Sequence, residues 1–374
     1  MKDKMETKKR FAPGSHPDLP PPPGTIGVVG WLHKNLFSSL GNSILSLLTI
    51  LFLYWLLTAS AGWFVIDAVA DASSRKECRE IDNGACWAVI SKRIGQFVYG
   101  FYPHEERWRP NLAFVLLLIA VAPLLYPGVP LRKHLMWFSA AYPIVAYFLI
   151  CGGLFGLSEV GTNTFGGFML TMIVGVTGIG ASLPLGIALS LGRQSRLLSV
   201  RVISIAFIEF MRGVPLITLL FVASTMLNYF LPPGTTFNLL LRVLIMVTFF
   251  ASAYIAEVIR GGIQAIPKGQ YEAASAMGLN YWQTTRLVTL PQALKISIPG
   301  IVNTFIGLYK DTTLVVVIGL LDPLGIGRAA LADAKWNGLS TETYLFVALF
   351  FFVSCFAMSR YSLWLEHRLN TEHK

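Results

Sequence analysis

The sequence is poor in charged residues. Of its 374 residues only 13% are Asp, Glu, Lys or Arg, whereas 54% are hydrophobic, and the mean hydropathy is +0.59. A soluble domain carries about 25% charged residues. The deficit excludes an ordinary soluble protein and predicts an all-α integral membrane protein, because a helix satisfies its own backbone groups in lipid.

Cysteine and recognisable catalytic motifs are also scarce. The four cysteines are too few for a disulfide scaffold, and no Cys-x-x-Cys or Cys/His spacing indicates a metal site. There is no G-x-x-x-x-G-K-[ST] loop for ATP, no nucleophile elbow and no H-E-x-x-H motif. Gly325-x-Gly327-x-x-Ala330 resembles a dinucleotide fingerprint, but we expect it in an outside loop. We therefore predict no catalytic residue, no metal and no cofactor in this chain.

Acidic residues are outnumbered. With 30 Lys and Arg against 20 Asp and Glu the net charge is +10, a balance that also occurs in nucleic-acid-binding proteins. Here, however, the basic residues fall in short loops between apolar runs, where the positive-inside rule explains them. The sequence therefore indicates a lipid bilayer as the partner and no nucleic acid.

A polar stretch interrupts the apolar second half of the chain. Pro267 suits the first turn of a helix, the residues up to Met277 are good helix formers, and Gly278 can adopt the left-handed conformation that ends one. Asn280 and Gln283 have the spacing of a capping pair for a second short helix. These signals predict a helix, a glycine bend and another helix.

Small residues line one face of the first helix. Ala273, Ala274 and Met277 fall at i, i+1 and i+4, so they form a shallow face that another protein can approach closely. An ordinary amphipathic connector between two membrane helices is the alternative, and composition alone does not separate the two interpretations.

The stretch resembles the cytoplasmic EAA loop of ABC importer permeases: Glu-Ala-Ala, three residues, Gly, and later Leu-Pro. In that family the loop is the coupling helix that docks on the ATP-hydrolysing subunit. The resemblance implies this role for Glu272, Ala273, Ala274, Ser275, Ala276, Met277, Gly278, Leu279, Leu290 and Pro291.

Further motifs resemble the polar amino-acid uptake branch of these permeases, over about residues 164–364. They are FIEFMRGVPL (207–216), AYIAE with RGGI (253–263), PKGQ (267–270) and KDTTL (310–314). The first half, with Cys86-Trp87 and Trp108-Arg109-Pro110, is similar to the M-type membrane subunit of general L-amino-acid permease (Aap/Bzt) systems.

The resemblance implies a complete importer. Its expected partners are two copies of an ATP-binding subunit, which bind the ATP and Mg, and a periplasmic amino-acid-binding protein. The second permease subunit is expected to be a related but different chain. The expected location is the bacterial inner membrane, and the expected activity is import of L-amino acids from the periplasm.

The apolar runs predict about eight spans, since a hydrocarbon core of roughly 30 Å needs about 20 residues. We expect them at residues 40–66, 111–126, 135–157, 165–191, 203–231, 239–259, 296–320 and 343–365. Gly152 and Gly156 form a G-x-x-x-G that permits helix packing, and residues 94–102 suggest an amphipathic segment at the membrane surface.

These spans suggest four regions. The expected regions are a disordered basic and proline-rich tail (1–35), an extension with three helices and a periplasmic loop at 67–110 (36–163), a type I ABC importer transmembrane domain with the coupling loop 261–295 (164–364), and a short tail (365–374). With the coupling loop inside, an even number of spans places both termini in the cytoplasm. The short outside loops then hold no Lys or Arg, as the positive-inside rule requires.

Cys78 and Cys86 both fall in the 67–110 loop. In an oxidising periplasm they can form a disulfide. Two free thiols are the alternative, because spacing in sequence does not reveal the geometry that a bridge needs.

Ionisable groups at membrane depth are costly, so each is a candidate for the translocation path. Glu209 and Arg212 also have the spacing of a local ion pair, as do Glu257 and Arg260. Gly213 and Pro215 can break the helix and expose backbone groups. The full set of path candidates is Glu209, Arg212, Gly213, Pro215, Tyr254, Glu257, Lys310, Asp311, Thr312 and Thr313. For the last four, contact with a second membrane subunit is the alternative.

Three function classes follow. The leading one is the permease subunit of an ABC importer, which is not itself an ATPase. A gradient-driven amino-acid transporter or channel predicts inverted repeats and buried acids for coupling ions, and no internal repeat is visible. A membrane-embedded enzyme is disfavoured by the missing catalytic motifs.

Overall fold

The computed structural model describes residues 27–126, 128–154, 156–226, 229 and 237–369. Most of the expected N-terminal tail, the loop at 230–236 and residues 370–374 lie outside these ranges. Residues 27–35, expected to be extended or disordered, instead form helix α1 (Gly27–Asn35). The last helix continues to Leu369, into the segment expected as a tail.

Within the described residues the chain is helical, with isolated β-bridges and no strand. Seven helices are long and apolar enough to cross a membrane, and a pair bent by 103° makes an eighth. The predicted all-α membrane fold with about eight spans is therefore confirmed. The spans are Leu40–Ile66, His104–Leu125, Arg132–Cys151, Gly167–Arg193, Leu239–Gln264, Tyr281–Ile318 and Ser340–Leu369, with the bent pair Leu198–Gly213 and Leu216–Met226.

The chain divides into two compact units, residues 1–68 with 82–85, and residues 69–81 with 86–374. The first unit contains α2 (Leu40–Ala61), which continues into a π-helical turn at Gly62–Ile66. Ser39 caps α2, since its hydroxyl accepts the N–H of Asn42 at 3.2 Å. No residue of α2, which is described throughout, is buried inside the protein. A helix that is apolar on all sides and uncovered is suited to contact with lipid.

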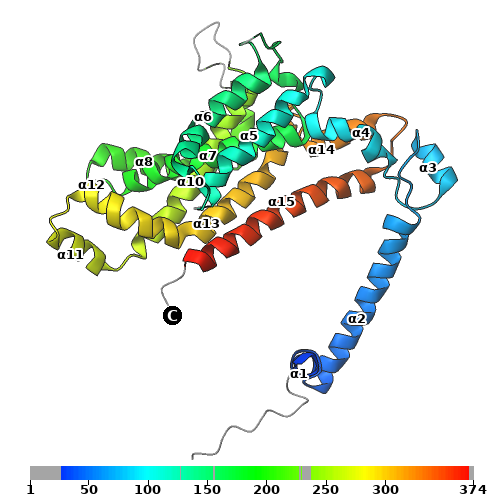
Figure 1. Cartoon of the computed structure of the whole chain (residues 1–374), viewed down its shortest axis with the longest axis horizontal. Helices are drawn as coiled ribbons and strands as arrows, with labels where there is room; N and C mark the ends of the chain where they lie inside the picture. Colours follow the sequence, from blue (N-terminus) through cyan, green and yellow to red (C-terminus); the bar gives the residue numbers. More distant parts are fainter. Residues whose placement is uncertain (1–26, 127, 155, 227–228, 230–236, 370–374) are drawn as a thin grey trace, which may run out of the picture. The chain divides into compact units, whose positions relative to one another are not determined.

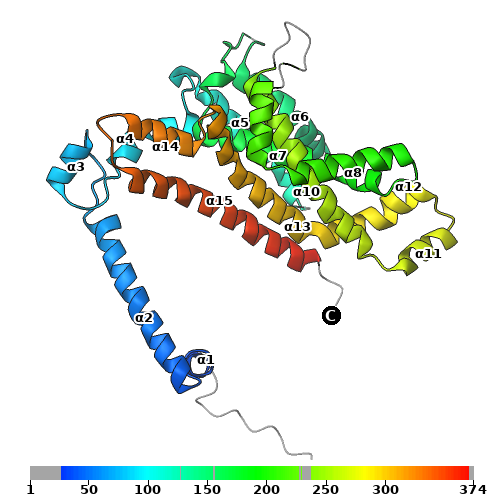
Figure 2. The same cartoon turned by 180° about the vertical axis from the view of Figure 1, so that it is seen from behind.

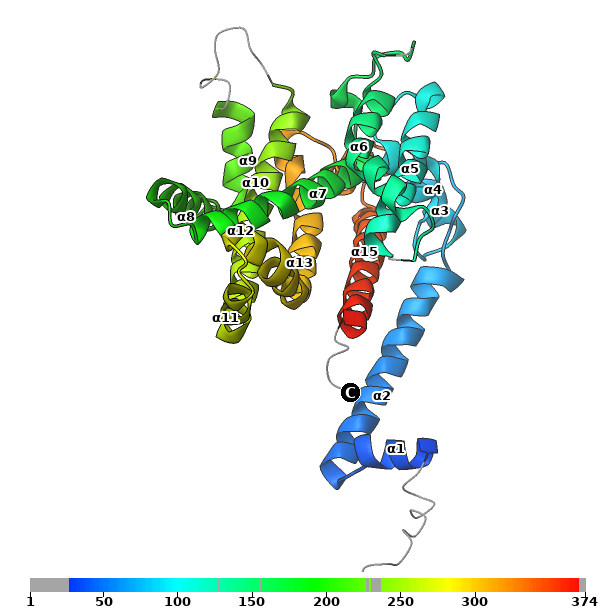
Figure 3. The same ribbon diagram turned by 60° about the vertical axis from the view of Figure 1, so that its left-hand side comes forward.

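The core of the second unit is built from α7 (Gly167–Arg193), α10 (Leu239–Gln264) and α13 (Leu290–Asp311). Figure 3 shows α7 lying across α10, and Val174 and Val243 are fully buried in the cluster between them. A Cβ added at Gly262 would lie 2.6 Å from the carbonyl oxygen of Ala293. Glycine at this position therefore permits α10 and α13 to pack backbone to backbone.

Helices α5 (Trp108–Leu125) and α6 (Arg132–Cys151) pack as a pair, and the hydroxyl of Tyr142 donates to the Ala113 carbonyl at 3.0 Å. The prediction that α6 continues to residue 157 and carries a G-x-x-x-G packing motif is wrong. Gly152 and Gly156 both have φ near +75°, so they lie in the loop that follows the helix.

Helices α3 (Arg75–Ile81), α4 (Ala88–Tyr99) and α14 (Pro323–Ala332) lie at one end of α13 and α15 (Ser340–Leu369), and α11 (Lys268–Ala276) lies at the other (Figures 1 and 2). We call these the α14 end and the α11 end.

Two segments at the α14 end are helical. Residues 94–99 of the segment expected to be amphipathic belong to α4, whose Phe97 is buried against α14 and α15. Gly325 and Gly327, expected in a loop, lie inside α14, because the Asp322 side chain caps that helix by accepting the Gly325 N–H at 2.8 Å.

Candidate functional site

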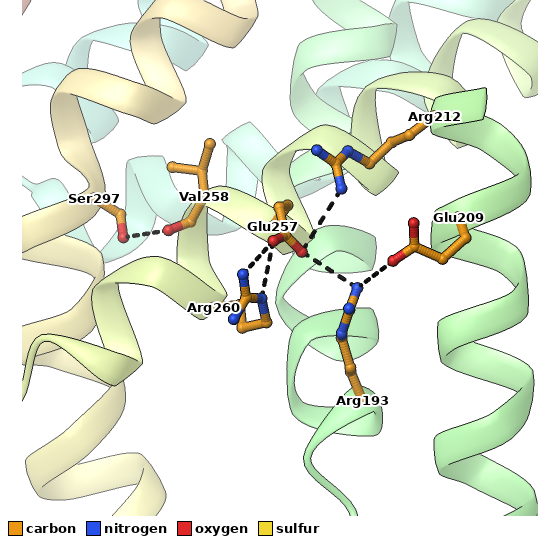
Figure 4. A network of polar contacts seen from close by, with 7 residues as sticks. All are labelled: Arg193, Glu209, Arg212, Glu257, Val258, Arg260 and Ser297. Carbon is orange, nitrogen blue, oxygen red and sulfur yellow. Dashed lines mark hydrogen bonds and ion pairs between the residues drawn. The ribbon is translucent and has the colours of Figure 1, made fainter. Parts of the chain in front are cut away.

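Five charged side chains from three helices meet toward the α11 end (Figure 4). Arg193 ends α7, Glu209 and Arg212 lie on α8 (Leu198–Gly213), and Glu257 and Arg260 lie on α10. We call them the arginine–glutamate network. Glu257 is its centre, because it contacts all three arginines.

The distances show which arginine contacts which glutamate. Nη1 of Arg193 lies 2.9 Å from Glu209 and 3.3 Å from Glu257. Arg212 lies 3.9 Å from Glu257, and Arg260 holds the other oxygen of Glu257 through two nitrogens, Nε at 3.0 Å. The side chain of Glu257 is 22% exposed, so these pairs are only partly screened by solvent.

The predicted local pair of Glu209 and Arg212 is wrong, since each residue pairs with another helix. Arg193 brings α7 to Glu209, and Glu257 brings α10 to Arg212. The second predicted local pair, Glu257 with Arg260, is present. Sequence reasoning did not single out Arg193 as a member of the site, because both of its partners lie on other helices.

The chain breaks directly after Arg212. Helix α8 ends at Gly213, and α9 (Leu216–Phe221) starts after Pro215 at a bend of 103°. The predicted break at Gly213 and Pro215 is therefore present. The guanidinium of Arg212 lies over the ring of Tyr254, 5.6 Å from its centroid. A break of this kind places backbone polar groups beside a charged, aromatic-lined wall.

The predicted helix–glycine–helix also forms. Helix α11 is followed by Gly278 at φ +74°, and α12 (Tyr281–Thr284) starts with a capping box between Asn280 and Gln283. A π-helical turn (Thr285–Thr289) leads into α13, which begins at Leu290 with Pro291 in its first turn.

One detail of this stretch differs from the expectation. Ala273 and Met277 are exposed, but Ala274 is only 4% exposed and faces the protein. The outward face at the bend therefore combines exposed small residues such as Ala273 with two large side chains, Met277 at 80% and Trp282 at 72% exposure.

The KDTT motif lies apart from the network. After α13 ends at Asp311, the hydroxyls of Thr312 and Thr313 donate to backbone carbonyls one turn back, at 2.7 and 2.9 Å. Lys310 is exposed and Asp311 half-buried. Among the residues that the structure describes, no hydrogen bond or ion pair joins this motif to the arginine–glutamate network.

Cys78 and Cys86 form a disulfide, with Cα atoms 5.9 Å apart. Both are buried, and the N–H of Cys86 donates to the Glu342 carboxylate of α15 at 3.3 Å. Across the described part of the chain, no three His, Cys, Asp or Glu side chains are placed to hold a metal ion.

The known proteins to which this chain is similar are membrane components of transport systems. The family described as "Binding-protein-dependent transport system inner membrane component" matches residues 182–371. The chain is 46% identical to the glutamate/glutamine/aspartate/asparagine transport system permease protein BztC of Rhodobacter capsulatus, over 95% of this chain and 96% of that protein. It is 47% identical to the inner membrane amino-acid ABC transporter permease protein YhdY of Escherichia coli, over 96% and 97%.

A solved structure described as an amino acid ABC transporter with histidines is 27% identical over 54% of this chain and 91% of that one, with a TM-score of 0.48. The resemblance to Aap/Bzt-type permeases, first noted on sequence motifs, is confirmed by the two full-length relatives. This chain belongs to the family of binding-protein-dependent transport system inner membrane components.

Proposed function

We propose that this chain is the membrane-spanning permease subunit of an ATP-driven importer that moves L-amino acids from the periplasm into the cytoplasm. The family and the names of the two full-length relatives support this function. Because one relative is named for glutamate, glutamine, aspartate and asparagine, L-glutamate and L-glutamine are the first substrates to test.

The observation that carries the proposal is the exposed bend around Gly278. Met277 and Trp282 present large apolar surface on a rigid turn, and such surface is typical of a protein interface. We infer that a separate ATP-binding subunit docks on α11 and α12. In the complete importer two copies of that subunit bind ATP and Mg, one under each permease chain.

The coupling route follows from the covalent order. Helix α10 leads into α11, and α12 leads through the π-helical turn into α13, so a shift of the bend pulls on two core helices. Glu257 on α10 then transmits the shift to α7 and α8 through Arg193 and Arg212. Nucleotide changes the balance between inward- and outward-open states only if the two states hold the docked subunit with unequal affinity.

The substrate path is assigned to the broken helix. The backbone at Gly213 and Pro215, with Arg212 beside it, offers polar groups that suit the carboxylate and ammonium of an amino acid. Lys310 is exposed on α13, and an exposed ammonium at membrane depth needs a polar neighbour. A second, related permease chain or the path itself supplies that neighbour.

The orientation places the α11 end in the cytoplasm, the α14 end in the periplasm and both termini inside. The basic loops and the family's inner-membrane location support it. A disulfide at the α14 end agrees with an oxidising periplasm.

Two variants of Gly278 test the coupling role in the purified complete transporter. A Cβ at this position meets no described atom within 4 Å, so a substitution clashes with nothing in this chain itself. Gly278→Val is strained at φ +74°, whereas Gly278→Asn tolerates that conformation. We expect Val to abolish ATP-dependent uptake of L-glutamine, with the protein still folded in the membrane, and Asn to retain uptake.

Co-purification completes the test. The ATP-binding subunit should accompany the wild type and be lost with Gly278→Val. Normal uptake by the Val variant would remove the coupling role. A wild-type chain that purifies alone and moves amino acids in liposomes without ATP would favour the gradient-driven alternative.

A further inference from the structure

A strongly basic hollow opens at the α14 end. Its volume is about 420 Å³, and it lies between α3 and the loop that joins α14 to α15. Four cationic side chains line it: Arg75, Lys76, Arg79 and Lys335. All four are exposed, so the hollow presents its charge to solvent.

The two segments that form the hollow are tied to each other. The N–H of Arg75 donates to the Lys335 carbonyl at 2.8 Å, and its Nη1 donates to the Asn337 carbonyl at 3.0 Å. The Cys78–Cys86 disulfide anchors α3, and Trp336 anchors the loop in the same buried cluster. The four cations are therefore carried on a fixed frame rather than on independent loops.

Three acids close in sequence to the segments of the hollow have hydrogen-bond partners outside it. Asp71 pairs with Lys92 at 2.7 Å, Glu77 accepts the Ser73 N–H at 2.7 Å, and Asp333 pairs with Arg93. These hydrogen bonds lower the pKa of Asp71 and of Glu77, so both stay ionised with their own partners.

Three of the four cations have no ion-pair partner in the described chain, and Arg75 is held instead by the Lys335 and Asn337 carbonyls. Glu80 reaches only Lys76, at 3.8 Å, and both side chains are exposed. Among the residues that the structure describes, neither Arg79 nor Lys335 has an ion-pair partner. Four like charges on one rigid frame repel one another, and an acidic surface brought against them relieves that repulsion.

We propose that this hollow is the docking surface for an acidic patch on the periplasmic binding protein. The inference rests on the proposed function, which places the α14 end outside and requires a binding protein to deliver substrate there. The hollow lies at the opposite end of α13 and α15 from the coupling bend (Figure 2). Charge complementarity of this kind speeds encounter between partners and sets their register.

The test uses the complete transporter in nanodiscs and its purified binding protein loaded with L-glutamine. ATP hydrolysis is measured against binding-protein concentration at about 50 mM and about 500 mM salt. We expect the double variant Arg79→Glu with Lys335→Glu to raise the half-saturating concentration about tenfold at low salt and much less at high salt. The maximal rate should stay unchanged, because neither residue takes part in coupling.

A neighbouring substitution of opposite sign is the matched control. Glu80→Lys removes the one anion paired with Lys76 and adds a cation, a change of two charges, and should lower the half-saturating concentration about two- to threefold. An improvement of this kind does not arise from misfolding, so it separates charge from structural damage.

The outcomes are distinct. A wild type that responds to binding protein, with half-saturation unchanged in both variants, overturns the docking surface and leaves the proposed function intact. A wild type that ignores binding protein at every concentration overturns both. If the variants act only in phosphatidylglycerol nanodiscs and not in phosphatidylcholine, the hollow binds lipid headgroups and the docking proposal fails.

Discussion

The arginine–glutamate network and the basic hollow are built from the same residue types and arranged in opposite ways. In the network three arginines surround two glutamates, and every charge except Arg260 has a partner on another helix. In the hollow only one of the four cations, Lys76, has an ion-pair partner in the described chain, and the other three have none.

Paired charges and unpaired charges serve different purposes in this protein. Paired charges hold α7, α8 and α10 together and are partly shielded from solvent. Unpaired charges on a rigid frame do nothing for the fold, because exposed cations gain little from each other. A cluster of exposed cations without ion pairs is therefore best explained by a binding partner that supplies the missing negative charge.

Removing the centre of the network should have the largest effect. Glu257→Gln leaves three arginines without their shared carboxylate, and we expect the membrane-embedded fold to lose about 2–3 kcal/mol, together with transport. The apparent unfolding temperature in detergent measures it. Glu209→Gln, with one partner and a side chain 54% exposed, should cost less than about 1 kcal/mol. Equal losses for the two variants would contradict a network centred on Glu257.

Removing the disulfide that anchors α3 should have the next largest effect on stability. Replacing Cys78 and Cys86 by serine removes the bridge that holds α3. The expected local loss is about 2 kcal/mol, or roughly thirtyfold faster trypsin cleavage at Arg75, Lys76 and Arg79. Cys151→Ser with Cys355→Ser is the control, since both thiols are free. Cleavage as slow as in the wild type would mean that packing alone holds the segment.

Asp322 extends the comparison to a buried carboxyl group that forms no ion pair among the residues that the structure describes. Burial raises its pKa to about 6, and its Oδ2 has no hydrogen-bond partner among the described residues. A carboxyl group with a raised folded-state pKa contributes full stability below its unfolded pKa, and this is lost as the pH rises through about 6.

Asp322→Asn keeps the cap on Gly325 and removes the charge. We expect the variant to be more stable than the wild type by about 1–2 kcal/mol at pH 7.5 and to lose the pH dependence between about 4 and 6. Unfolding temperatures over that range, with the exposed Asp71→Asn as control, provide the check. A stability difference between the wild type and Asp322→Asn that does not grow with pH there would refute the raised pKa.

The smallest effect should come from supplying the hollow with an acid. Asn337→Asp is nearly isosteric and adds one negative charge beside the unpaired cations. Stability should change by less than about 0.5 kcal/mol, while binding-protein half-saturation rises roughly two- to threefold. An unchanged half-saturating concentration of binding protein would indicate that the binding protein does not contact this position.

Local signals in the sequence were sufficient for the turn at Gly278. A glycine ends the helix, Asn280 and Gln283 form the capping box, and Pro291 begins the next helix, because each depends only on residues a few positions away. The span at Leu40–Ile66 was equally predictable from length and hydropathy. The roles assigned to these residues stay predictions until the variants above are measured.

Long-range pairing was not predictable in the same way. Glu209 and Arg212 have ideal spacing for one another, yet the bend after Gly213 sets α8 where Arg193 and Glu257 are nearer partners. Gly152 and Gly156 matched a packing motif that depends on helical backbone, which ends at Cys151. In both cases a tertiary feature decided the outcome.

The members of the arginine–glutamate network are synthesised at different times. Arg193 and Glu257 are separated by 64 residues, so at about 5–20 residues per second the ribosome makes Glu257 roughly 3–13 s after Arg193. Glu209 is only 16 residues after Arg193 and so becomes available to it early in that interval, whereas the partner of Arg212 lies on α10, which is not yet made. The insertion of α10 therefore completes the network, and in a chain halted before α10 Arg212 lacks its Glu257 partner.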